Sequence, residues 1–202
     1  MPINEIGDRQ NKLRKNGYYY QTLEIETYPY YKNSYGGYSQ DSTKPYKQIR
    51  LYPIILFANG STINYGSFSG LAENSAFNFG QKCNLTDSNT LQSSIAHFEC
   101  YMQNLPPLRL NFINKKAEIW NQGIFQVSNN EIRIQIFYNS IGNYYLYEKT
   151  GKVINDSTFS LSSVKDFQNG KEEKITEIFK FHEMNNLPVI SSYILNHKSK
   201  FN

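Results

Sequence analysis

Residues Trp120–Leu161 read WNQGIFQVSNNEIRIQIFYNSIGNYYLYEKTGKVINDSTFSL, and this stretch decides the fold. Within it, Ile132, Ile134 and Ile136 alternate with Glu131, Arg133 and Gln135. This alternation is the period-two pattern of a strand that has one buried and one solvated face. The stretch therefore predicts β-structure rather than helix.

Turn-forming residues divide this stretch into short strands. Strands are predicted over Gly123–Val127, Glu131–Tyr138, Tyr144–Lys149, Lys152–Asn155 and Thr158–Leu161. The turns between them are predicted at Ser128-Asn129-Asn130, Thr150-Gly151 and Asn155-Asp156-Ser157. Consecutive strands joined by tight turns pair with their sequence neighbours, so the stretch predicts an antiparallel meander. A meander with one buried face needs either a second layer or closure on itself.

The rest of the chain adds further strands and one helix. Strands are predicted over Asn16–Tyr31, ending near Pro29, and over Ile49–Ala58, Ser61–Phe68, Leu108–Phe112 and Lys174–Glu183. Asn59-Gly60 is the strongest hairpin signal, whereas Lys32–Lys47 lacks periodicity and is interpreted as a long loop. Leu91, Ile95, Phe98 and Met102 recur at helical spacing within Asp87–Leu105, with Asp87 or Ser88 as the predicted N-cap.

These elements predict a mainly β fold, a single antiparallel meander barrel of eight to ten strands with one mid-chain helix. The chain has 202 residues, of which 17 are tyrosine and 13 phenylalanine, and these aromatic residues suit a pleated, half-buried surface. The expected organisation is a flexible tether over residues 1–16, one barrel domain over 17–195 and a polar tail over 196–202. The net charge of +4 is too small to predict dedicated nucleic-acid binding.

The two cysteines, Cys83 and Cys100, are predicted to form a disulfide that fastens the irregular segment before the helix onto it. The pairing requires their Cα atoms to lie within about 7 Å. The alternative is two buried free thiols. The prediction is tied to export, because disulfides persist in oxidising compartments.

Signatures of catalysis, metal binding and cofactor binding do not appear in the sequence. His97, His182 and His197 lack metal-ligand spacing, and neither a nucleophile elbow nor a phosphate-binding loop is present. We therefore predict no catalytic residues, no metal and no cofactor. Glu24 and Glu26 share one strand face, which leaves open a carbohydrate-active enzyme, although such pairs also occur on a solvated edge strand.

Two groups of aromatic residues are candidates for binding. A hollow barrel would present a ligand cavity lined by Trp120, Phe125, Ile134, Tyr145, Tyr147 and Phe179, whereas a solid core would use the same residue types. The Tyr-rich loop over residues 28–46 would present Tyr30, Tyr31, Tyr35 and Tyr38 to a partner. Tyrosine combines a flat apolar face with a polar tip, which suits sugars, peptides and proteins. These tyrosines would alternatively fill or shield the barrel.

The hairpin Gly123–Val127 with Glu131–Phe137, and the later run Gly151–Phe159, resemble the lipocalin-like barrels of envelope lipoproteins from Gram-negative bacteria. This resemblance implies a β-barrel in the cell envelope, either in the periplasm or at the outer membrane. It also implies that a leader has been removed, and that any contact with the membrane would be made through a lipid anchor. A cytoplasmic location is the alternative. The predicted function is non-enzymatic binding of a small apolar ligand or a protein partner. The alternative is an inhibitor-type or immunity-type interaction module that uses the Tyr-rich loop.

Overall fold

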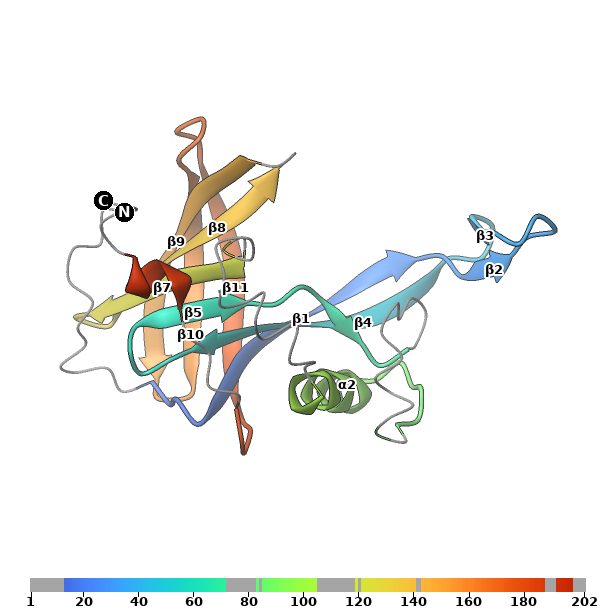
Figure 1. Cartoon of the computed structure of the whole chain (residues 1–202), viewed down its shortest axis with the longest axis horizontal. Coiled ribbons are helices and arrows are strands. Elements are labelled where there is room, and N and C mark those ends of the chain that lie inside the picture. Colours follow the sequence, from blue (N-terminus) through green and yellow to red (C-terminus); the bar gives the residue numbers. More distant parts are fainter. Residues whose placement is uncertain are drawn as a thin grey trace. The chain divides into compact units, whose positions relative to one another are not determined.

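The computed structural model describes residues 13–71, 83, 85–104, 119, 121–140, 143–187 and 192–197. The fold is mainly β, as predicted, with one helix of substantial length (Figure 1). The barrel strands are β1 Gly17–Thr27, β4 Tyr46–Leu56, β5 Ser61–Asn64, β7 Gln122–Ser128, β8 Glu131–Ser140, β9 Asn143–Asn155, β10 Thr158–Asp166 and β11 Glu172–Glu183. The remaining elements are β2 Tyr30–Lys32, β3 Tyr38–Gln40, β6 Phe68–Ser69, α2 Leu91–Gln103 and α4 Tyr193–Asn196.

Eight antiparallel strands close into the predicted barrel. Hydrogen bonding follows the order β1-β11-β10-β9-β8-β7-β5-β4, and a further pairing of β1 with β4 closes the ring. Apart from β1 and β11, the first and last barrel strands, neighbours around the ring are consecutive barrel strands along the chain, which is the connectivity of a meander. The predicted hairpin of β7 and β8 is confirmed, because Asn129 and Asn130 form its turn with φ values of 51° and 65°.

The described residues divide into two compact units. The barrel unit is drawn from Met1–Gln21, Pro53–Gly66 and Leu105–Asn202, and the hairpin unit from Thr22–Tyr52 and Ser67–Asn104. Strands β1 and β4 each contribute residues to both units. The hairpin unit also contains β2, β3, β6 and α2, which are inserted between barrel strands in the sequence.

The core of the barrel unit is aliphatic and aromatic. Phe159 is fully buried and stacks on Phe179, with ring centroids 4.9 Å apart and planes 11° apart, and it also meets Tyr19 at 5.0 Å. The Tyr19 hydroxyl donates to the carbonyl of Asp156, and burial raises the pKa of this hydroxyl. The buried members of the core are Leu13, Tyr19, Ile54, Leu56, Phe125, Ile132, Ile134, Ile136, Phe159, Leu161 and Phe179.

The outer face of β7 and β8 carries a smaller apolar cluster. Ile124 and Ile194 are both buried there, with Phe137 and Leu195 packed against them. Ile194 belongs to α4, whose first backbone amide, that of Tyr193, donates to the side chain of Gln122. Helix α4 therefore covers part of the outside of the barrel wall.

In the hairpin unit, helix α2 is fastened to the chain after β6. Gly70 donates its amide to the Ser94 hydroxyl, and the Ser93 hydroxyl donates back to the Gly70 carbonyl. The N-cap is Thr90 rather than the predicted Asp87 or Ser88, since the Thr90 hydroxyl accepts from the Ser93 amide at 3.1 Å.

Cys83 and Cys100 are joined by a disulfide, the pairing predicted from the sequence. Their Cα atoms lie 6.2 Å apart, within the required reach. Cys100 is buried in α2, so the bond ties residue 83 to this helix. By closing a short loop, the disulfide lowers the entropy of the unfolded chain and stabilises the folded state by about 3 kcal/mol.

One predicted turn is wrong. Strand β9 runs without interruption through Thr150-Gly151, where a turn between two strands was expected. Gly151 pairs with Ile132 on one side and Leu161 on the other. A Cβ atom at this position would lie 1.8 Å from the carbonyl oxygen of Ser160. Glycine is therefore required at position 151 because two strands approach each other closely inside the sheet, and not because the chain turns there.

One predicted strand and one predicted cavity-lining residue fall on residues that the structure leaves undescribed. The strand expected over Leu108–Phe112 and the residue Trp120 lie outside the described residues.

Within the described part of the chain, no helix combines the length and the apolar character that crossing a membrane would require.

Candidate functional site

The Tyr-rich segment is a hairpin rather than the long loop predicted over Lys32–Lys47. Strands β2 and β3 pair antiparallel, with Tyr31 opposite Ser39, and β4 already begins at Tyr46. The sequence lacks strand periodicity here because each of these strands has only three residues. The hairpin is nevertheless an ordered two-stranded sheet of the hairpin unit (Figure 1).

Asn33 builds the tip of this hairpin. Its side-chain oxygen accepts from the amides of Tyr35 and Gly37, at 3.1 and 2.9 Å, and its side-chain nitrogen donates to the Ser39 hydroxyl at 3.0 Å. The Asn33 amide also donates to the Gly37 carbonyl. Gly36 has a φ of 80°, which glycine adopts without strain. One asparagine therefore fixes most of the turn.

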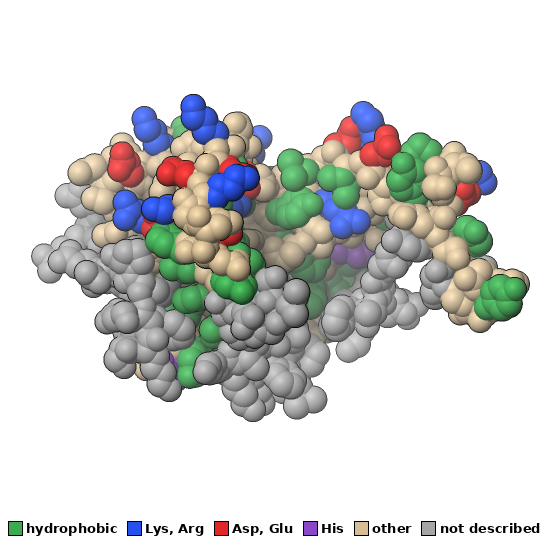
Figure 2. Space-filling view, turned by 90° about the horizontal axis from the view of Figure 1, so that it is seen from above, with side chains coloured by type: hydrophobic (Ala, Val, Ile, Leu, Met, Phe, Trp, Pro, Cys, Tyr) green, Lys and Arg blue, Asp and Glu red, His purple; other side chains and the backbone are tan. Residues whose placement is uncertain are grey.

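The turn presents Tyr35 to solvent. Tyr35 is 97% exposed, the largest value among the large hydrophobic side chains in the described part of the chain, and Tyr31 is 54% exposed. Figure 2 shows hydrophobic side chains at the end of this hairpin. The side chains of Tyr30 and Tyr38, the other predicted partner-binding residues, lie outside the description. Tyr31 and Tyr35 do not fill or shield a core.

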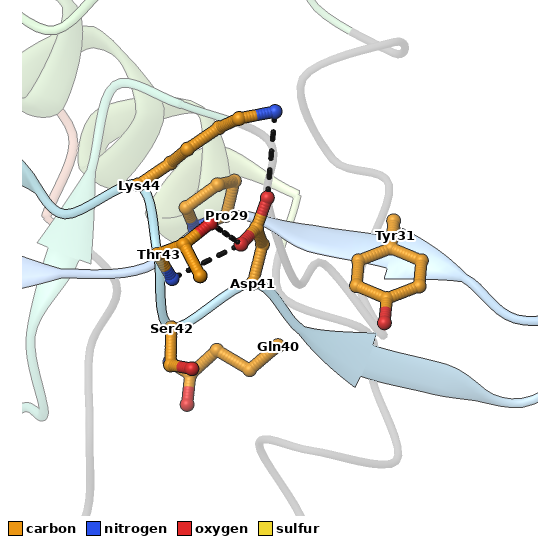
Figure 3. A pocket seen from close by; sticks show the side chains of 7 residues that line it. All are labelled: Pro29, Tyr31, Gln40, Asp41, Ser42, Thr43 and Lys44. Carbon is orange, nitrogen blue, oxygen red and sulfur yellow. Dashed lines mark hydrogen bonds and ion pairs between the residues drawn. The ribbon is translucent and has the colours of Figure 1, made fainter.

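A pocket of about 660 Å³ lies at the base of the same hairpin (Figure 3). It is lined by Pro29, Tyr31, Gln40, Asp41, Ser42, Thr43 and Lys44. Figure 3 shows the Tyr31 ring on one side and the linked side chains of Asp41, Thr43 and Lys44 on the other. Residues 40–44 lie within the Tyr-rich loop 28–46 that was predicted to bind a partner, but none of them was a predicted site residue, since the prediction rested on the tyrosines.

Asp41 organises the polar side of the pocket. One carboxylate oxygen accepts from the Thr43 amide at 3.0 Å and from the Thr43 hydroxyl at 2.5 Å, and the other lies 3.5 Å from the Lys44 ammonium. The Asp41 amide donates to the Pro29 carbonyl at 2.8 Å. The hydrogen bonds from Thr43 are the main cause that lowers the pKa of Asp41, with the Lys44 charge adding to them.

The residues predicted to line a ligand cavity fall into two groups. Phe125, Ile134 and Phe179 are 3%, 1% and 5% exposed and belong to the packed core. The structure therefore places these three side chains in the barrel core. Tyr145 and Tyr147 are half-buried, and Tyr147 packs against the edge of that core.

Tyr147 stands beside polar groups that face the barrel interior. Its hydroxyl accepts from the Asn64 side chain at 3.4 Å, and burial is the main cause that raises its pKa. Next along the same face, Lys149 contacts both carboxylate oxygens of Glu177 at 2.7 Å, and the two side chains are only 20% and 19% exposed. Lys149 is two residues from Tyr147 and four from Tyr145, so strand alternation puts all three side chains on the same face of β9. This alternation in the sequence could have predicted that Lys149 faces the barrel interior.

The described residues contain no group of three or more His, Cys, Asp or Glu side chains placed to hold a metal ion. Glu24, one of the two carboxylates considered for catalysis, forms an exposed ion pair with Lys47 at 2.8 Å. Comparisons of the chain with protein-family models, with curated proteins and with solved structures find no match.

Proposed function

We propose that this chain is a non-enzymatic binding protein that recognises a protein partner through hairpin β2–β3. The observation that carries the proposal is the 97% exposure of Tyr35 at the tip of a turn fixed by Asn33. The closed barrel is compatible with a binding role.

The geometry of the tip suits protein recognition. Tyrosine is enriched among residues that dominate binding energy, because its ring buries a large area at a small cost in side-chain entropy. A turn already ordered by hydrogen bonds loses little further freedom on binding.

A small apolar ligand inside the barrel, in an envelope protein of lipocalin type, is the second candidate. The partly exposed Tyr145 and Tyr147 favour it, whereas the burial of Phe125, Ile134 and Phe179 in the core counts against a deep cavity. The hairpin is the better supported site because its aromatic rings are accessible.

A photo-crosslinking amino acid at position 35 tests the proposal. We expect irradiation of cells of the natural host to give a defined covalent adduct with one protein, because the Tyr35 side chain lies in the proposed interface. The matched control is the same amino acid at Ile154, which is 60% exposed on β9 of the barrel unit. No adduct at position 35, or the same adducts at both positions, would contradict the proposal.

A further inference from the structure

We propose that the pocket at the base of hairpin β2–β3 binds an uncharged saccharide, with the Tyr31 ring as its stacking surface. This site goes beyond the protein partner proposed for Tyr35, since its ligand is a small molecule and Tyr35 does not line it. The proposal rests on the size of the pocket, its charge balance and its accessible hydrogen-bonding groups.

The size of the pocket fits a small ligand. Its volume of about 660 Å³ lies within the range of about 300–1,000 Å³ that is usual for small-molecule sites. Most such sites are lined by apolar side chains, however, and here Pro29 and Tyr31 are the apolar members among seven lining residues. A ligand of this pocket must therefore be mostly polar and carry one apolar face.

The charge of the pocket is balanced. Asp41 and Lys44 are the charged lining residues, and they lie 3.5 Å from each other. The Thr43 hydrogen bonds hold Asp41 in its ionised form, so the pair stays neutral as a whole. An anionic or cationic ligand would find no uncompensated opposite charge in this lining, which favours an uncharged one.

The polar groups match a polyhydroxylated ring. Gln40 and Ser42 are exposed, so their side chains are accessible to a ligand. Together they offer an amide donor, an amide acceptor and a hydroxyl group, and sugar hydroxyls both donate and accept. Tyr31 supplies a flat apolar surface against which the C–H face of a sugar ring can stack.

A short peptide is the competing ligand for such a surface. The recurring modes of peptide binding use main-chain pairing at a sheet edge, an apolar groove for a helix, or an aromatic-lined groove for proline-rich segments. This pocket offers a single tyrosine ring and a run of polar side chains. The lining therefore favours a saccharide over a peptide.

The test is a glycan array probed with the full chain, followed by calorimetry with a soluble oligosaccharide of the bound type. The array should carry neutral, sialylated and sulfated glycans, and we expect binding to neutral ones. Tyr31→Ala should weaken the calorimetric affinity by about tenfold, because it removes the apolar ring against which the sugar stacks. Gln40→Ala should also weaken it. Both positions are exposed, so circular dichroism should show both variants folded.

The matched control is Tyr35→Ala, which removes the same side chain from the same hairpin but outside the pocket. It should bind the oligosaccharide as the natural chain does. The proposal is overturned if no neutral glycan is bound, if only charged glycans are bound, or if Tyr31→Ala and Gln40→Ala bind normally. Retained crosslinking at position 35 in any of these cases would leave the protein-partner proposal standing on its own.

Discussion

Phe159→Ala is expected to lower the free energy of unfolding by about 3–5 kcal/mol. Phe159 is fully buried, stacks on Phe179 and contacts Tyr19, so its removal leaves a cavity at the centre of the barrel core. The surrounding strands are joined in a closed ring and can collapse only partly into that cavity. Urea denaturation followed by circular dichroism measures the loss.

Ile178→Ala is the matched control for this prediction. Ile178 is next to Phe179 on β11 but is 50% exposed on the outer face of the barrel. Its truncation should cost less than about 1 kcal/mol, because it creates no internal cavity. Equal losses for Phe159→Ala and Ile178→Ala would show that Phe159 does not lie in a packed interior.

Lys149→Met is expected to lower the free energy of unfolding by about 3 kcal/mol at neutral pH. The substitution leaves the Glu177 carboxylate in the barrel interior without the ammonium group that contacts both of its oxygens at 2.7 Å. The pair is about four-fifths buried, so water compensates only in part for the lost partner. Thermal and urea unfolding of the variant measure the effect.

The double variant Lys149→Met, Glu177→Leu distinguishes the effect of an uncompensated Glu177 charge from the effect of altered packing. Replacing a buried ion pair by apolar residues of similar volume is often neutral or stabilising, so the double variant should recover most of the stability lost by Lys149→Met. A double variant that is no more stable than Lys149→Met would contradict the account, because the loss would then not come from an uncompensated Glu177 charge.

The barrel was predictable from local patterns. Ile132, Ile134 and Ile136 alternate cleanly, and all three are buried on one face. The turn at Asn129 and Asn130 follows from the tolerance of asparagine for positive φ. The helical spacing of Leu91, Ile95, Phe98 and Met102 likewise predicts α2, although propensity could not distinguish Thr90 from its polar neighbours as the N-cap.

Other features depend on contacts that local patterns do not contain. Gly151 resembles a turn residue, but the close approach of the Ser160 carbonyl, which requires glycine there, is a tertiary contact. The pairing of Lys149 with Glu177 joins residues on β9 and β11, and the pocket around Asp41 depends on hairpin β2–β3, whose strands are too short for periodicity. The exposure of Tyr35 follows from the Asn33 turn rather than from its tyrosine-rich surroundings.

The most direct test of the central claim is the dissociation constant for the protein that crosslinks at position 35, measured with the natural chain and with Tyr35→Ala. We expect Tyr35→Ala to weaken binding by about thirtyfold, the effect of losing one dominant interface residue. Its unfolding midpoint should be unchanged, since the side chain is 97% exposed. A dissociation constant equal to that of the natural chain would contradict recognition through the hairpin.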